Sequence, residues 1–171
     1  LNVQLPMWIA AGDEDKHDWA RLRLAQARAA IALQPGGLAI LLDCGEFDNI
    51  HPTDKRTPGE RLCDVALRVV YGMDAPESPR ALGKYTQGDT LVVTLSAPVL
   101  RRETGELLLE IAGEDGAYHP VQSVTLDGTE MRLRSVAVLH PAKVRYAYVN
   151  WGKVSLFGRN GLPLAPFALE G

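Results

Sequence analysis

The chain has little of what marks several specialised classes of protein. It contains 2 cysteines among 171 residues, which is too few for a disulfide scaffold. Lysine and arginine total 18 against 21 aspartates and glutamates, a net charge of −3, so no basic surface for nucleic acid or anionic lipid is expected. No apolar run approaches the roughly 20 residues that cross a bilayer. We therefore expect no nucleic-acid and no membrane partner, and a hydrophobic content of 46% indicates an ordinary globular chain.

The two cysteines, Cys44 and Cys63, lie in apolar stretches of the sequence. Buried free thiols are the usual state of such residues. A disulfide between them stays open as an alternative, because the strand and helix expected to carry them follow one another in the chain. The sequence opens at Leu1 with strand-like residues and no charged and apolar leader, so we expect a further segment upstream.

Residues 1–73 alternate between strand and helix patterns. An apolar strand is expected over residues 3–9, followed by an acidic loop and a helix over residues 18–33. The predicted buried stripe of this helix is Trp19, Leu22, Gln26, Ala29 and Leu33. The continuous apolar run at residues 38–42 is typical of a strand in a parallel sheet.

A second helix is expected to start at Thr57, the predicted N-cap, with Pro58 in its first position and Glu60 completing a capping box. Gly72 would end it. Its predicted buried face is Leu62, Val65, Ala66, Val69 and Val70. This β-α-β-α order predicts an α/β unit whose loops gather at the carboxyl ends of parallel strands.

Residues 74–171 have a different pattern, in which no helical period is present. Short β-rich runs at residues 91–95, 107–111, 121–126 and 144–148 are separated by glycine, aspartate and proline. The dipeptide Asp127-Gly128 between two such runs is a typical hairpin turn. We expect a small antiparallel β-sandwich here, with residues 74–79 as the linker to the first unit.

The loop at residues 45–52 carries the strongest candidates for catalysis. Its His51 has the residue type that takes a proton from a hydroxyl nucleophile near neutral pH. Asp48, three residues earlier, is spaced to orient the imidazole, and Pro52 restricts His51 to an extended backbone. Ligands of open parallel sheets lie outside the strand carboxyl ends, where this loop is expected. A solvated loop histidine is the alternative interpretation.

The residues around this loop resemble a known enzyme family. The run from Leu42 to Lys55, followed by Gly59-Glu60-Arg61-Leu62, is similar to the closing block of the sialate O-acetylesterases, which belong to the SGNH (GDSL-like) hydrolases. That block contains an Asp-x-Gly strand end, an Ile-His-Pro, a Lys and a Gly-x-Arg-Leu. The segments Val3-Gln4-Leu5-Pro6 and Gly161 to Phe167 also resemble the family, so the likeness covers essentially the whole chain.

The resemblance implies the C-terminal β-α-β-α part of an SGNH (flavodoxin-like) hydrolase domain, residues 1–73, followed by the sandwich. His51 is then the catalytic histidine, and Asp48 occupies the position of the acid that orients it. Asp43 and Glu46 are fallbacks for that role, and a Ser-His dyad without an acid is the alternative mechanism. The family's nucleophilic serine, and the Gly and Asn of its oxyanion hole, have no counterpart here. An upstream segment of the same protein would supply them.

The implied function is that of a carbohydrate O-acetylesterase, acting on sialic acid or on acetylated plant or bacterial glycans. The acetylated carbohydrate is its substrate partner, and no cofactor and no metal are called for. The resemblance also implies a secreted or periplasmic location in a bacterium. A non-catalytic carbohydrate-binding module that uses Tyr146, Tyr148 and Trp151 on the sandwich is the alternative function.

Other residues are weaker candidates. The chain's serines lie in the linker or in the β-rich half without a strand-to-helix elbow: Ser78, Ser96, Ser123, Ser135 and Ser155. His17, His119 and His140 have no carboxylate or cysteine at metal-ligand spacing. Trp151 would stack on a sugar ring or, by the favoured interpretation, pack between the two parts of the chain. Lys55 and Arg61 would fix the loop or an inter-domain contact, or lie on a solvated face.

Overall fold

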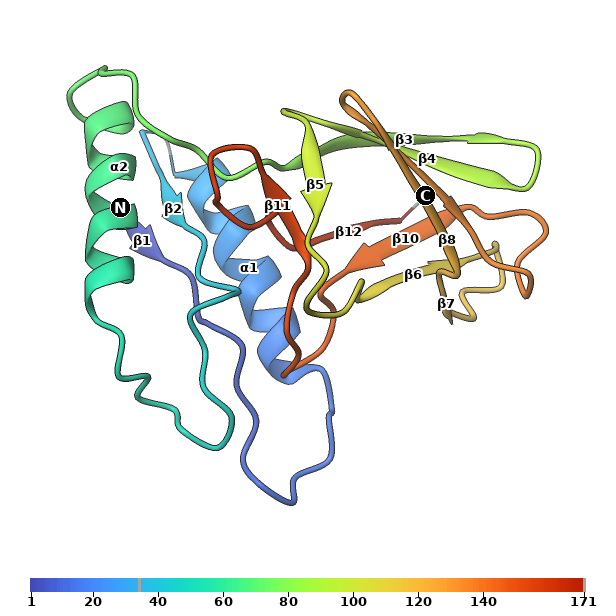
Figure 1. Cartoon of the computed structure of the whole chain (residues 1–171), viewed down its shortest axis with the longest axis horizontal. Helices are drawn as coiled ribbons and strands as arrows, with labels where there is room; N and C mark the ends of the chain where they lie inside the picture. Colours follow the sequence, from blue (N-terminus) through green and yellow to red (C-terminus); the bar gives the residue numbers. More distant parts are fainter. Residues whose placement is uncertain (34, 171) are drawn as a thin grey trace.

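The computed structural model describes residues 1–33 and 35–170 (Figure 1). The first part of the chain follows the order β1 (Asn2–Val3), α1 (Asp18–Ala32), β2 (Leu38–Ala39) and α2 (Arg56–Val69). The later strands are β3 (Ala81–Gln87), β4 (Thr90–Leu95), β5 (Val99–Arg101), β6 (Leu109–Ala112), β7 (His119–Pro120), β8 (Ser123–Asp127), β9 (Glu130–Arg134), β10 (Lys143–Tyr146), β11 (Leu156–Gly158) and β12 (Phe167–Leu169). The described chain is therefore rich in β-sheet, and both of its helices lie in the first part.

Strands β1 and β2 pair in parallel, with Asn2 opposite Leu38 and Val3 opposite Ala39. Each is two residues long, shorter than the predicted strands over residues 3–9 and 38–42. On the side of β1 away from β2, a side-chain amide takes the place of a neighbouring strand. Leu5 N–H donates to Gln26 Oε1 (2.9 Å), and Gln26 Nε2 donates to Val3 C=O (3.2 Å).

Helix α1 buries a different face from the predicted one. Leu22 and Leu33 of the predicted stripe are 48% and 67% exposed. The buried positions are Ala20, Arg23 and Ala30. Arg23 is completely buried because its guanidinium donates to the backbone C=O groups of residues 147 and 149, in the sandwich part of the chain. An apolar pattern could not identify a helix face whose central contact is polar.

Helix α2 begins at Arg56, one residue before the predicted N-cap Thr57. The backbone N–H groups of Arg56 and Thr57 both donate to Asp54 Oδ1 at 3.0 Å. Asp54 therefore satisfies the helix start. The predicted capping box is absent, because Glu60 pairs with Arg56 Nε (2.6 Å) instead.

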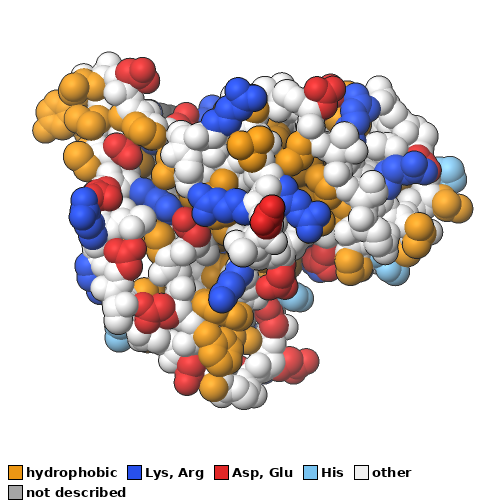
Figure 2. Space-filling model, in the orientation of Figure 1, with side chains coloured by type: hydrophobic (Ala, Val, Ile, Leu, Met, Phe, Trp, Pro, Cys, Tyr) orange, Lys and Arg blue, Asp and Glu red, His pale blue; other side chains and the backbone are white. Residues whose placement is uncertain are grey.

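The predicted buried face of α2 is also only partly buried. Val65 is 2% exposed, whereas Val70 near the end of the helix is 62% exposed. Val70, Tyr71 and Met73 gather into an exposed apolar group beyond the C-terminal end of α2 (Figure 2, upper left). Gly72, with φ 62°, ends the helix as predicted.

The rest of the chain forms two four-stranded antiparallel sheets, β3-β4-β9-β8 and β12-β10-β6-β7, and a smaller pair, β11-β5. This fits the predicted sandwich, and each predicted run contributes to a strand. Strands β8 and β9 form a hairpin whose turn contains Gly128 at φ 57°, as expected from Asp127-Gly128. Within the described residues no helix follows α2.

One hydrophobic core runs through both parts of the chain. Met7, Ile40 and Leu42 from the first part pack in the same buried cluster as Leu133 and Tyr146 from the sheets. Residues 72–80 form neither helix nor strand, in agreement with an extended connection there, and the domain boundary at residues 73 and 74 stays a prediction. No helix in the described ranges is long and apolar enough to cross a membrane.

A single buried residue, Asn150, joins the end of the sandwich to the start of α1. Its Oδ1 accepts the backbone N–H groups of Trp19 (3.0 Å) and Ala20 (3.4 Å), so it caps the helix from 130 residues away. Its Nδ2 donates to Asp18 Oδ1 (2.7 Å), and this hydrogen bond is the main reason that the pKa of Asp18 lies below its usual value. The first turn of α1 is thus held by a residue that sequence reasoning did not single out for this role.

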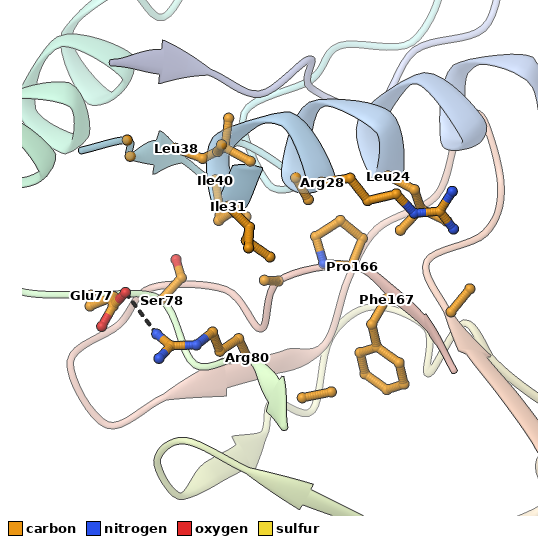
Figure 3. A pocket seen from close by; sticks show the side chains of 17 residues that line it. Leu24, Arg28, Ile31, Leu38, Ile40, Glu77, Ser78, Arg80, Pro166 and Phe167 are labelled. Atoms are coloured by element: carbon orange, nitrogen blue, oxygen red, sulfur yellow. Dashed lines mark hydrogen bonds and ion pairs between the residues drawn. The ribbon is translucent and has the colours of Figure 1, made fainter. Parts of the chain in front are cut away.

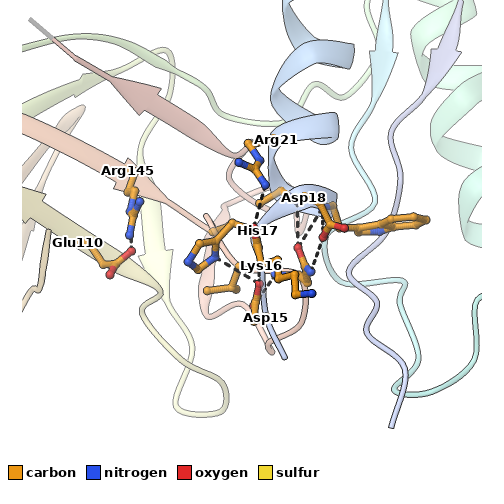
Figure 4. Close-up of polar contacts among 12 residues, drawn as sticks. Asp15, Lys16, His17, Asp18, Arg21, Glu110 and Arg145 are labelled. Atoms are coloured by element: carbon orange, nitrogen blue, oxygen red, sulfur yellow. Dashed lines mark hydrogen bonds and ion pairs between the residues drawn. The ribbon is translucent and has the colours of Figure 1, made fainter. Parts of the chain in front are cut away.

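The backbone of Asn150 extends the same junction. Its N–H donates to Asp15 Oδ2 (2.8 Å), and its C=O accepts the N–H of Trp8 (2.8 Å). Figure 4 shows Asp15, His17 and Asp18 gathered beneath the first turn of the helix. Asn150 therefore connects the loop after β1, the start of α1 and the sandwich.

We expect Asn150→Ala to lower the free energy of unfolding by about 2 to 4 kcal/mol, because it removes a helix cap and leaves buried polar groups without partners. Urea unfolding monitored by circular dichroism would measure the change. Asn2→Ala is the matched control, since Asn2 is exposed at the chain start, and should cost less than about 0.5 kcal/mol. Equal effects of the two substitutions would contradict the assigned role of Asn150.

Candidate functional site

The loops that follow β1 and β2 lie side by side at one end of the parallel pair (Figure 1, lower edge). Two hydrogen bonds join them: Asp48 N–H donates to Ile9 C=O (3.1 Å), and Ala11 N–H donates to Asp48 Oδ1 (2.8 Å). Gly45 allows this approach, because a Cβ there would lie 1.9 Å from Met7 C=O. The glycine of the predicted Asp-x-Gly strand end is thus required by the close packing of these loops.

His51 lies on the exposed surface of this loop pair. Its backbone N–H donates to Asn49 Oδ1 (3.0 Å). This hydrogen bond fixes the backbone of the turn and does not involve the imidazole. Within the described residues, the imidazole has no hydrogen bond or ion pair. The ring is therefore accessible to a hydroxyl brought to it from outside the chain.

Asp48 is held in a left-handed backbone conformation, with φ 58°. Aspartate tolerates this region better than most residues, at a modest energetic cost. Its Oδ1 is occupied by Ala11 N–H, and in the described parts of the chain no hydrogen bond joins its carboxylate to His51. The structure thus brings Asp48 and His51 into one loop without the contact of a triad, and the orienting role of Asp48 stays a prediction.

The two fallback acids are committed to other partners. Glu46 accepts hydrogen bonds from Thr53 N–H and Oγ1, both at 2.6 Å, and from Asn49 Nδ2 at 2.7 Å. The Thr53 hydrogen bonds are the main cause of the lowered pKa of Glu46. Asp43 forms a two-pronged pair with Arg61 (2.6 and 2.8 Å). These contacts give Glu46 and Asp43 structural roles in shaping the loop.

Arg61 also donates to Ile40 C=O at 2.7 Å, so it ties α2 to the end of β2. This matches the prediction that Arg61 fixes the loop.

Both cysteines are free thiols, so the alternative of a disulfide is wrong. Cys63 is exposed, contrary to the expected burial. Cys44 is partly buried, and this burial is the main cause that raises the pKa of its thiol to about 12.

The aromatic residues expected on a carbohydrate-binding sandwich face are occupied by protein contacts. Tyr146 is completely buried in the core. Tyr148 packs against His17 (5.5 Å between ring centroids) and against the guanidinium of Arg145, which pairs with Glu110 (Figure 4). Trp151 packs edge-on against Phe47 of the 45–52 loop, at 5.7 Å. The favoured interpretation of Trp151, packing between the two parts, agrees with the structure.

A cavity of about 630 Å³ lies away from this loop. Leu24 and Arg28 of α1 face Pro166 and Phe167 across it, and Arg80 pairs with Glu77 at its rim (Figure 3). A second cavity of about 390 Å³ lies between the loop after β1 and the start of α1, and Trp8, Trp19 and Asn150 line it. Through Ile9 this second cavity adjoins the 45–52 loop.

Metal and nucleophile candidates do not assemble at the loop. In residues 1–33 and 35–170, no group of three or more His, Cys, Asp or Glu side chains could hold a metal ion. Ser155, for example, is buried and donates to Glu106 C=O. No serine of the described chain forms a hydrogen bond with His51.

Known proteins were compared with the chain. No protein-family model and no curated protein matches it. Several solved structures do, and one of them is the carbohydrate acetylesterase XAC1771 from Xanthomonas citri, with a TM-score of 0.87 and 32% sequence identity. The chain is similar to a carbohydrate esterase. The match covers 98% of this chain and 40% of XAC1771, so the chain spans less than half the length of that enzyme.

We expect Glu46→Gln to loosen the 45–52 loop, because an amide accepts the Thr53 hydrogen bonds more weakly than a carboxylate. Amide hydrogen exchange at Thr53 should accelerate in the variant at pH 7. In the unaltered protein the pKa of Glu46 is lowered, so its contribution should persist above the usual glutamate pKa and disappear as the pH falls through the lowered one. Unchanged exchange at Thr53 would contradict this anchoring role.

Proposed function

We propose that this chain supplies the catalytic histidine, His51, of a carbohydrate O-acetylesterase of the SGNH type. The observation that carries the proposal is the similarity to a carbohydrate acetylesterase over 98% of the chain at 32% identity. The chain's own geometry supports it. His51 is exposed on a loop that Glu46, Asp43 and Gly45 hold in place, at the end of the parallel strands where ligands of such sheets bind.

In the proposed reaction a serine hydroxyl from polypeptide outside this chain attacks the acetyl carbonyl carbon while His51 takes the hydroxyl proton. The sugar oxygen leaves and receives that proton from the imidazolium, which produces an acetyl-serine ester. His51 then removes a proton from water, the water oxygen attacks the acetyl carbonyl, and acetate is released with the serine restored. Asp48 holds the imidazole during these steps in the triad form of the proposal.

The serine-bearing segment is proposed to pack on the apolar surface that the first part of the chain exposes. Val3 on β1 is 37% exposed, and Leu22 and Leu33 on α1 are 48% and 67% exposed. Burial of such side chains contributes about 1.5 to 3 kcal/mol each when complete. A partner strand beside β1, on the side away from β2, would have to displace the Gln26 amide from Leu5 N–H and Val3 C=O.

We expect His51→Ala in the complete protein to lower kcat/KM for 4-nitrophenyl acetate by about 10²- to 10⁴-fold, because it removes the general base. Release of 4-nitrophenolate would measure it. His140→Ala is the control, since His140 is exposed on the sandwich, and should retain full activity. Wild-type activity in His51→Ala would refute the assignment.

Asp48→Asn tests the orienting acid separately. The asparagine Oδ1 can still accept Ala11 N–H, so the substitution removes the charge while it keeps the contact between the loops. We expect kcat to fall by about 10²-fold or more if Asp48 orients His51, with little change in thermal unfolding. A kcat within about 3-fold of the unaltered protein would favour the Ser-His dyad.

A further inference from the structure

The 390 Å³ cavity beside the candidate catalytic loop has the size of a small-ligand site. Its wall includes Trp8 and Ile9 from the loop after β1. The loop after β1 is hydrogen-bonded to the 45–52 loop: Ile9 C=O accepts Asp48 N–H, and Ala11 N–H donates to Asp48 Oδ1. A molecule in this cavity would therefore lie against the same segment that positions Asp48.

Two indole rings give the cavity its apolar character. Trp8 and Trp19 both line it, and their ring centroids are 5.2 Å apart. Trp19 Nε1 donates to Pro6 C=O (2.7 Å), whereas Trp8 Nε1 is buried and has no hydrogen-bond partner among the residues described. Aromatic walls of this kind suit a ligand that has an apolar face. A sugar ring has such a face.

The polar lining is strongly acidic. Asp13, Glu14 and Asp18 line the cavity against a single cation, Lys16. Asp13 and Glu14 are exposed, and their side chains make no described hydrogen bond. Asp18 accepts a hydrogen bond from the Asn150 amide, which lowers the pKa of Asp18 and holds its carboxylate at the cavity wall. Ionised carboxylates accept hydrogen bonds from sugar hydroxyls and repel a carboxylate on the ligand.

We infer that this cavity, with Trp8 and Trp19 as its aromatic walls and Asp13 and Glu14 at its mouth, is a subsite for a neutral sugar ring that discriminates against glycans bearing a carboxylate. The inference rests on the proposed esterase function, and it assigns a neutral acetylated glycan rather than a sialic acid as its substrate class. Discrimination comes from unfavourable contacts with the wrong ligand as much as from favourable contacts with the right one.

The test uses the complete protein and two substrates, O-acetylated xylo-oligosaccharides and 9-O-acetylated sialyllactose, with acetate release as the readout. The unaltered protein should have a kcat/KM for the neutral substrate about 10-fold or more above that for the sialoside. Asp13→Asn with Glu14→Gln should shift this ratio toward the sialoside by about 5-fold or more, because it removes two negative charges. Raising the salt concentration to 1 M should narrow the ratio in the unaltered protein, since salt screens exposed charges.

The matched control is Glu103→Gln with Asp127→Asn, which removes two exposed charges from the sandwich and should leave the ratio unchanged. A second variant, Trp8→Ala, removes one aromatic wall of the cavity and should lower the ratio of neutral-glycan to 4-nitrophenyl acetate activity by about 3-fold or more. An unchanged substrate ratio in the Asp13 and Glu14 variant would overturn the subsite. So would hydrolysis of the sialoside as fast as the neutral glycan by the unaltered protein.

Failure of the proposed function would give a different result. In that case His51→Ala would keep its activity on 4-nitrophenyl acetate, whatever the substrate ratio. Activity on 4-nitrophenyl acetate that depends on His51, without activity on either glycan, would retain the esterase and overturn the subsite.

Discussion

The geometry of the molecule depends on the cap that Asn150 provides for helix α1. Its side-chain oxygen satisfies the first N–H groups of the helix, and its backbone binds the loop after β1 and Asp15. A helix end left without such partners would bury unsatisfied donors. Because the cap comes from the loop after β10, the orientation of α1 depends on the sandwich part of the chain as well as on its own sequence. The completely buried Arg23 strengthens this arrangement, and burial lowers its pKa to about 10.

Backbone strain concentrates along the same junction. His17, Asp48 and Ala147 all have positive φ, between 53° and 58°, a conformation that non-glycine residues adopt only where the surroundings impose it. His17 starts α1, Ala147 receives the Arg23 guanidinium, and Asp48 binds the loop after β1. At Ala147 the strained backbone is held by a contact between the two parts of the chain, and at Asp48 it is held by contacts between the two loops of the first part. The candidate catalytic loop inherits its shape from these contacts and not from the short β1-β2 ladder.

The sequence was sufficient to predict the features that local chemistry determines. The order of strand and helix in the first part, the Asp127-Gly128 hairpin and the absence of described helices after α2 follow from periodicity and turn residues. The predicted buried face of α1 was wrong, because the buried Arg23 lies on another face of that helix, and the predicted face of α2 was only partly right, because Val65 is buried but Val70 is exposed. The predicted start of α2 was wrong as well, because Asp54, and not Thr57, accepts the backbone N–H groups of Arg56 and Thr57 at the start of the helix.

The candidate site, like the fold, could be predicted from the sequence only in part. The 45–52 loop could be located from sequence, since a histidine and an aspartate at that spacing follow an apolar strand. The cavity beside it could not, because its walls come from residues 8–19 and from Asn150, and only the long-range cap brings them together. Asp18 illustrates the connection. The amide that caps α1 also donates to the Asp18 carboxylate and lowers its pKa, so the contact that orients the helix also fixes the position of one charge in the cavity. A change that weakens the cap should therefore alter the fold and the electrostatics of the proposed subsite together.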